Sequence, residues 1–99
     1  MLHLSAYTED VHEWEGTERV NIRGIYNVYE AARIHGVKRV IFANSGGTML
    51  GYELESPYTE IAAEEYEYNL QVYPILTHLD AVRPNSICYV SKVFGEVLV

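Results

Sequence analysis

The chain has 99 residues, of which 48% are hydrophobic and 21% are charged, a composition typical of one small globular domain or part of one. Its formal net charge of −7 and its scattered basic residues argue against a nucleic-acid or anionic-membrane surface, since both need a basic stripe. The single cysteine excludes an internal disulfide, the first ten residues lack a signal-peptide pattern, and no apolar run approaches the ~20 residues of a membrane span. We therefore expect a cytoplasmic chain with a small-molecule partner.

The first 45 residues follow a strand, helix, strand pattern. Residues 1–6 are short and apolar, which predicts a buried strand. Apolar residues then recur at helical spacing over residues 18–35, opposite a charged face, and Gly36 supplies the residue type that closes a helix in the left-handed conformation. Residues 38–45 are rich in β-branched and aromatic side chains, as in a strand buried on both faces of a parallel sheet. The sequence thus predicts an α/β fold with a parallel βαβ unit.

This arrangement places polar residues at one edge of the sheet. The crossover of a βαβ unit is almost always right-handed, and ligands bind in the crevice beyond the carboxyl ends of the strands. Four residues follow those ends and are expected to border the crevice: Ser5, Ala6, Asn44 and Ser45. The glycines that come next, in residues 42–52, would let the backbone approach a ligand, although a tight turn needs the same residues.

The second half of the chain is less regular. Residues 51–85 contain many tyrosines and glutamates and three prolines, which predicts a long irregular excursion with one helix near residues 59–70. From Ser86 to Val99 apolar residues return at helical spacing after a cap at Asn85 or Ser86. The four histidines show no metal-ligand spacing, and the glutamate cluster is typical of a solvated face, so no metal site is predicted.

Several ordered motifs resemble one protein family. The helix motif N-x-x-G-T-x-N-V-x-E-A-A is matched at seven positions: Asn21, Gly24, Asn27, Val28, Glu30, Ala31 and Ala32. A strand ending in H-L precedes it, and Ser91 and Lys92 match the end of Y-G-x-S-K. The chain is similar in these features to the extended short-chain dehydrogenase/reductases, the NAD-dependent epimerase/dehydratase family.

The resemblance implies a partial NAD(P)-binding Rossmann-like domain over residues 1–99, without the glycine-rich N-terminal half and the C-terminal substrate region. An intact member would use NAD or NADP to oxidise a sugar or sugar-nucleotide hydroxyl by hydride transfer, as a dehydrogenase, a dehydratase or an isomerase of the epimerase type. Residues 52–83 are similar to the longer insertion of sugar-nucleotide epimerases or uronate dehydrogenases. Without the glycine-rich turn, whose amides hold the pyrophosphate, we expect this chain alone to bind no cofactor tightly.

The resemblance also assigns site residues. The family's tyrosine is a general base, its lysine binds the nicotinamide ribose and lowers the tyrosine pKa, and a serine or threonine binds the substrate oxygen. Lys92 takes the lysine role, and Ser45 takes the hydroxyl role with Thr48 as the alternative. The residues that would lie along the cofactor are Leu4, Ser5, Ala6, Asn21 and Lys92.

The tyrosine itself departs from the motif. Cys88 stands where the family has tyrosine, and Tyr89 stands where it has glycine. Positions three and four residues before Lys92 differ by about 100° around a helix, so Tyr89 is expected to share the lysine's face only if the helix is rotated or tightened. The departure predicts impaired hydride transfer, which the paired changes Cys88→Tyr and Tyr89→Gly should restore. The competing hypothesis is an inactive fragment that serves as an interaction surface, for example in a homodimer formed through the two long helices.

Overall fold

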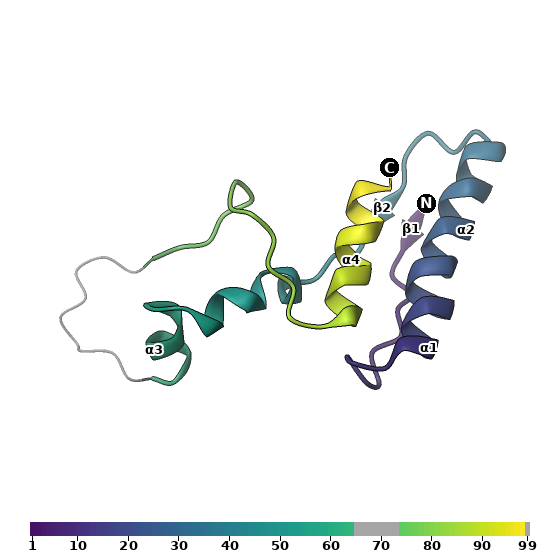
Figure 1. Cartoon of the computed structure of the whole chain (residues 1–99). Coiled ribbons are helices and arrows are strands. Elements are labelled where there is room, and N and C mark those ends of the chain that lie inside the picture. The colour runs from purple at the N-terminus through teal and green to yellow at the C-terminus, as the bar shows by residue number, and fades with distance from the viewer. Residues whose placement is uncertain (65–73, 99) are drawn as a thin grey trace.

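The computed structural model describes residues 1–64 and 74–98. Strands β1 (Leu2–His3) and β2 (Ile41–Phe42) form a parallel two-stranded sheet, in which Leu2 lies opposite Ile41 and His3 lies opposite Phe42. The helical stretch between them comprises α1 (Trp14–Gly16), a π-helical segment (Thr17–Ile22) and α2 (Arg23–Ile34), as Figure 1 shows. The predicted parallel pairing across a helical crossover is confirmed, with strands shorter than the sequence pattern indicated.

The ends of this helical stretch are set by local capping. The helix begins at Trp14, before the predicted residue 18, because the Glu13 carboxylate accepts hydrogen bonds from the Glu15 and Gly16 amides at 2.8 and 2.7 Å. Gly36 ends it with φ at +64°, and the Val37 amide donates to the Ala32 carbonyl at 2.9 Å. This is the Schellman pattern, so the predicted stop at Gly36 is confirmed.

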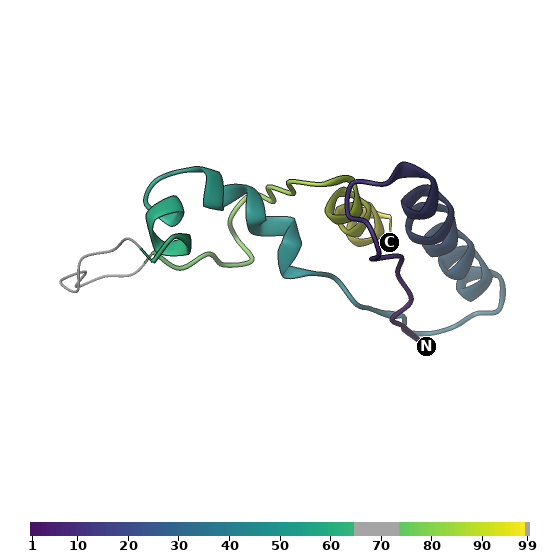
Figure 2. The ribbon, with the colours of Figure 1, turned by 90° about the horizontal axis from the view of Figure 1, so that it is seen from below.

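Both long helices cover the same side of the sheet. Figure 2 shows α2 and α4 (Ile87–Val97) together on one side of the strands. On that side the Phe42 ring meets the Tyr29 ring edge-on, with centroids 6.2 Å apart. On the other side Leu2 is 61% exposed and Ile41 is 57% exposed. The prediction that the second strand is buried on both faces is therefore wrong for the described residues, because no described helix covers the second face.

The excursion contains more helix than the sequence indicated. A 3₁₀ helix (Gly46–Leu54) follows β2, and α3 (Tyr58–Ala62) follows it. The predicted helix over residues 59–70 is thus present in its first part, and residues 65–70 lie outside the described residues. Figures 1 and 2 show this excursion extending away from the two long helices. The radius of gyration is accordingly 16.6 Å, against about 13 Å for a compact chain of this length.

Helix α4 is the predicted C-terminal helix. Ser86 is its N-cap, and its hydroxyl accepts a hydrogen bond from the Tyr89 amide at 3.4 Å. The helix packs against the π-helical segment, where Ser91 and Cys88 of α4 and Asn21 are almost completely buried. The described parts therefore form an α/β arrangement consistent with a partial Rossmann-like unit. In residues 1–64 and 74–98, no helix is both long and apolar enough to cross a membrane.

Candidate active site

Lys92 extends from α4 to the carboxyl end of β2. Its side chain is 6% exposed, and its ammonium nitrogen donates a hydrogen bond to the Ala43 carbonyl at 2.9 Å. The same nitrogen lies 5.1 Å from the centre of the Phe42 ring, within the range of a cation–π contact. The sheet edge that the sequence predicted as a ligand crevice therefore carries a fixed positive charge.

Tyr89 lies against the turn that follows this strand. A Cβ atom added to Gly47 would sit 2.2 Å from the Tyr89 ring carbons, so the ring occupies the space beside that glycine. Helix α4 and the segment of residues 43–47 run past one another, with Tyr89 at Gly47 and Lys92 at Ala43. Helix α4 is α-helical from Ile87 to Val97, without local tightening, and both side chains contact this segment at positions four residues apart. That Tyr89 shares the face of Lys92 only in a rotated or tightened helix stays a prediction.

Ser45 and Thr48 belong to the same turn, but they differ in what their hydroxyls can do. Ser45 caps the 3₁₀ helix, and its Oγ accepts a hydrogen bond from the Gly47 amide at 3.1 Å. Its hydroxyl hydrogen is then available to an incoming oxygen. Thr48 is buried, and its hydroxyl donates to the Ser45 carbonyl at 2.8 Å. The geometry favours Ser45 over Thr48 as the residue that donates to a substrate oxygen.

Cys88 is directed toward the first helix. Its side chain is 2% exposed, its sulfur lies 3.6 Å from the Tyr7 carbonyl, and the Asn21 amide nitrogen lies 3.7 Å from the same sulfur. Asn21 in turn holds Tyr7, accepting from its backbone N–H at 2.7 Å and donating to its carbonyl at 3.2 Å. The amide of Asn21 is therefore already engaged in fixing the segment after β1, and its contact with a cofactor stays a prediction.

Burial and charge shift the pKa values of two side chains at this edge, Lys92 and His3. Burial lowers the pKa of Lys92, an effect that the nearby Cys88 side chain partly offsets. Burial also lowers the pKa of His3, and the positive charge of Lys92 lowers it further. The His3 ring stacks on Phe42 at a centroid distance of 6.0 Å. This layer beneath Lys92 therefore favours a neutral histidine.

The remaining predicted residues follow β1. Leu4 and Ser5 are exposed and Ala6 is half-buried, so this stretch leaves surface on which a dinucleotide could lie. Because β1 and β2 are parallel neighbours, it leaves the sheet at the same edge as Ser45. Among residues 1–64 and 74–98, no group of three or more His, Cys, Asp or Glu side chains is placed to hold a metal ion.

Sequence reasoning missed two contacts that shape this edge. Gly47 receives the Tyr89 ring, and the Asn44 amide donates a hydrogen bond to the Glu96 carboxylate at 2.9 Å. The glycine pair in the turn was the available signal for the first, whereas nothing local pairs Asn44 with a residue 52 positions away. Residues 43–47 thus carry the Ser45 hydroxyl between the contact of Lys92 with Ala43 and the contact of the Tyr89 ring with Gly47.

Comparison with known proteins found relatives among sugar-oxidising enzymes. The chain is 34% identical over 99 residues to an L-arabinose 1-dehydrogenase (NAD(P)(+)) of Haloferax volcanii, covering 99% of this chain and 36% of that enzyme. It is 55% identical over 96 residues to a uronate dehydrogenase of Pseudomonas putida and 40% identical over 78 residues to one of Agrobacterium fabrum. These matches cover 97% and 79% of this chain, and 29% and 23% of those enzymes. No family model matches the chain, and no solved structure gives a significant match.

Proposed function

Because the chain is homologous to NAD(P)-dependent dehydrogenases of the NAD-dependent epimerase/dehydratase type, we propose that it is the central part of a sugar or uronate dehydrogenase. The chain spans between 23% and 36% of the length of the relatives described above, so we propose the activity for an intact enzyme that contains these residues. The observation that supports the proposal is that Lys92 contacts Ala43 and Tyr89 contacts Gly47, one on each side of Ser45.

We assign each residue a role in this reaction. The Ser45 hydroxyl, whose hydrogen is available, donates to the substrate oxygen and orients it. Tyr89, in its deprotonated phenolate form, takes the proton of the substrate hydroxyl as general base. Lys92 supplies a positive charge that favours the deprotonated oxygens formed during the reaction. The bound NAD(P) would accept the hydride, with Leu4, Ser5, Ala6, Asn21 and Lys92 as the residues proposed to lie along it.

A uronic acid is the first substrate to test, because the uronate dehydrogenase of Pseudomonas putida is 55% identical over 97% of this chain. We would build a chimera in which the matching segment of that enzyme is replaced by these residues, and follow NAD⁺ reduction with uronic acids, aldoses and sugar nucleotides. Turnover of uronic acids is expected. A folded chimera that binds NAD⁺ but oxidises none of these substrates would contradict the proposed activity and favour the inactive interaction surface.

Two controls accompany this experiment. The unmodified Pseudomonas putida enzyme sets the reference rate, and calorimetry of the 99-residue chain with NAD⁺ measures binding in the absence of the remaining sequence. We propose that the chain alone binds negligibly, because helix N-terminal amides that hold a pyrophosphate supply much of such a site. Saturable micromolar binding by the chain alone would contradict this part of the proposal.

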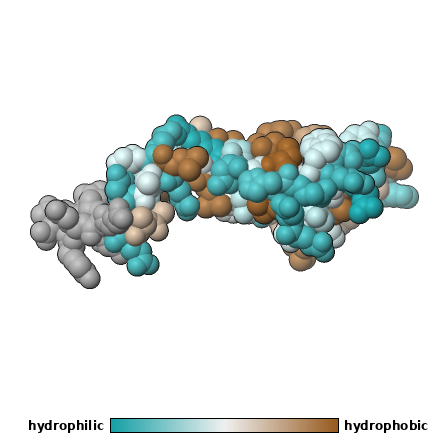
Figure 3. Space-filling model, turned by 60° about the horizontal axis from the view of Figure 1, so that its bottom comes forward, coloured by the Kyte–Doolittle hydropathy of each residue, from teal (hydrophilic) through white to brown (hydrophobic). Residues whose placement is uncertain are grey.

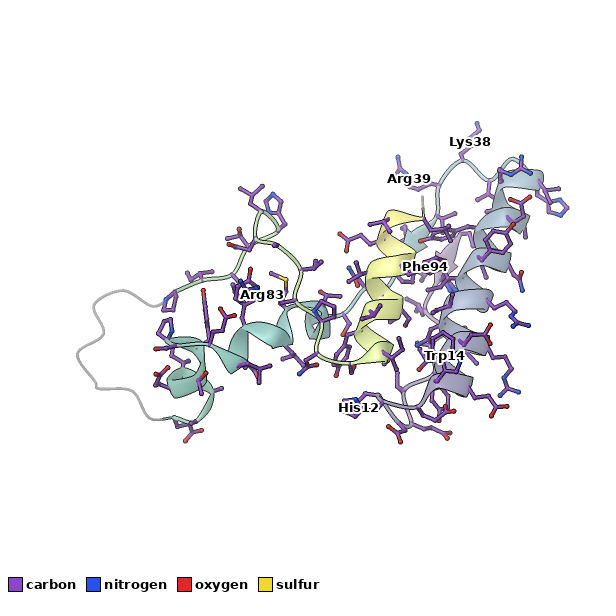
Figure 4. All side chains as sticks on the ribbon, in the orientation of Figure 1. His12, Trp14, Lys38, Arg39, Arg83 and Phe94 are labelled. Atoms are coloured by element: carbon purple, nitrogen blue, oxygen red, sulfur yellow. The ribbon has the colours of Figure 1, made fainter. Side chains whose placement is uncertain are left out.

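We also propose a homodimer formed through the two long helices. Figure 3 shows hydrophobic areas interrupting the hydrophilic surface on one face of the molecule. Exposed large apolar side chains on the helices include Trp14 of α1, Tyr26 of α2, and Val90 and Val97 of α4. Figure 4 labels Trp14 at the start of the first helix, where its side chain is 58% exposed. Aromatic side chains that become buried when two proteins associate contribute much of the affinity of the interface.

The change Trp14→Glu is expected to weaken self-association of the chimera at least about tenfold, the effect of losing ~1.4 kcal/mol. The matched control is Leu79→Glu, an equally charged change at a side chain that is 84% exposed in the excursion. Sedimentation velocity over a range of concentrations measures the dimer dissociation constant of both variants. Equal weakening by the two changes, or a monomeric parent, would contradict dimerisation through the helices.

A further inference from the structure

The segment that leads into α4 is fastened to the 3₁₀ helix at Arg83. Its backbone N–H donates to the Thr48 carbonyl at 2.7 Å, and its carbonyl accepts from the Gly51 N–H at 2.6 Å. Arg83 stands three residues before Ser86, the N-cap of α4. Two backbone hydrogen bonds therefore join the turn that carries Ser45 to the chain that begins the helix carrying Tyr89.

The side chain of Arg83 strengthens the same junction. Its guanidinium lies 4.4 Å from the centre of the Tyr52 ring and forms a salt bridge with Glu55. The Tyr52 hydroxyl donates to the Ala81 carbonyl at 2.9 Å, which adds a bond between the outgoing and returning chains. Figure 4 shows Arg83 beside the 3₁₀ helix. Arg83 thus contacts this helix through its backbone and its side chain.

The junction requires glycine at position 51. A Cβ atom added there would lie 2.5 Å from the Arg83 carbonyl oxygen and 2.9 Å from the Arg83 Cβ. Neither atom is the end of a flexible side chain, so any larger residue must push the two chains apart. At Gly46, five residues earlier in the same 3₁₀ helix, an added Cβ would meet nothing within 4 Å. The two glycines therefore form a matched pair, one at a close approach and one in open space.

We propose that Gly51 and Arg83 form a latch that positions the Ser45–Thr48 turn against the start of α4. Tyr89 stands 41 positions after Thr48, so the placement of Tyr89 on Gly47 depends on contacts that close this excursion. The latch joins the two ends of this excursion. It binds at Thr48 where the excursion begins and at Arg83, three residues before the N-cap of α4, where it ends. Gly51 and Arg83 act through the placement of Ser45 and Tyr89, and this consequence rests on the proposed function.

The test compares Gly51→Ala with Gly46→Ala. In the 99-residue chain, Gly51→Ala is expected to lower the hydrogen-exchange protection of the Arg83 amide at least about tenfold, since its bond to Thr48 is strained or lost. In the chimera it is expected to lower kcat about 10²-fold, the effect of a misplacement of about 1 Å, while KM changes less than about threefold. Gly46→Ala is expected to leave the protection of the Arg83 amide unchanged, because the added Cβ meets nothing within 4 Å.

The outcomes separate this inference from the proposed function. If the chimera turns over and Gly51→Ala leaves both the Arg83 protection and kcat unchanged, the latch inference is overturned while the function stands. If the chimera is inactive, the amide exchange still decides: equal protection of Arg83 in both variants overturns the latch. Should Gly51→Ala not fold, Arg83→Met replaces it, because that change removes the side-chain contacts with Tyr52 and Glu55. If Arg83→Met then leaves both the exchange protection of the amide at position 83 and the kcat of the chimera unchanged, the inference is overturned.

Discussion

Replacing Tyr89 with phenylalanine is expected to lower the kcat of the chimera about 10²- to 10⁴-fold, the usual contribution of a positioned general base. The change removes one oxygen and leaves the ring that packs on Gly47, so the placement of α4 should persist. The control is Tyr26→Phe, the same change at an exposed tyrosine of α2, for which no loss is expected. Initial rates of cofactor reduction and thermal melting of both variants provide the measurement.

The paired change Cys88→Tyr and Tyr89→Gly decides between two interpretations of the helix. The motif alone predicts that the pair restores activity by returning tyrosine to its usual register. The structure predicts the opposite. The paired change removes the phenol at Gly47 and forces a new ring into the buried space between Tyr7 and Asn21. Overpacking of this kind costs about 1–3 kcal/mol. A paired variant faster than the parent would show that Tyr89 is not the base.

The parts of the fold that were predictable have their causes close together in sequence. Gly36 ends the first helix through hydrogen bonds to residues three to five positions away, and Ser86 caps α4 through an amide three positions later. Such signals involve one turn of chain, so they do not depend on the rest of the molecule. The parallel pairing of the strands was also predictable, because a helix of this length between two short strands leaves few other topologies.

The parts that were not predictable depend on residues far apart in sequence. The angular separation of Tyr89 and Lys92 on a helix could be worked out from the sequence, but what each side chain contacts could not. The segment of residues 43–47 passes along α4 and contacts Lys92 at Ala43 and Tyr89 at Gly47. The contact between Gly47 and Tyr89 spans 42 positions, and nothing in either local sequence indicates it. Likewise, the helices cover one sheet face, so Leu2 and Ile41 remain exposed despite an apolar pattern.

Replacing Lys92 with methionine is expected to separate activity from stability. Methionine keeps much of the lysine's length and removes its charge, so kcat of the chimera should fall about 10²-fold or more, as for other groups that stabilise developing negative charge. Stability should change by less than about 1 kcal/mol, because the lost hydrogen bond to Ala43 is offset by the cost of burying an ammonium group. The control is Lys38→Met, which removes the same charge at an exposed position in the loop before β2 (Figure 4).

The pH dependence of stability provides a second readout with a definite sign. Burial lowers the pKa of Lys92 in the folded chain, so around its titration the unfolded chain binds more protons than the folded chain does. Stability of the parent should therefore rise as pH increases from the folded pKa toward the ordinary lysine value, because the buried group loses its charge first. Lys92→Met should lack this rise and Lys38→Met should keep it, as measured by thermal melting across the alkaline range. If Lys92→Met melts several degrees lower at neutral pH, Lys92 stabilises the fold, and its loss of activity could no longer be assigned to the missing charge.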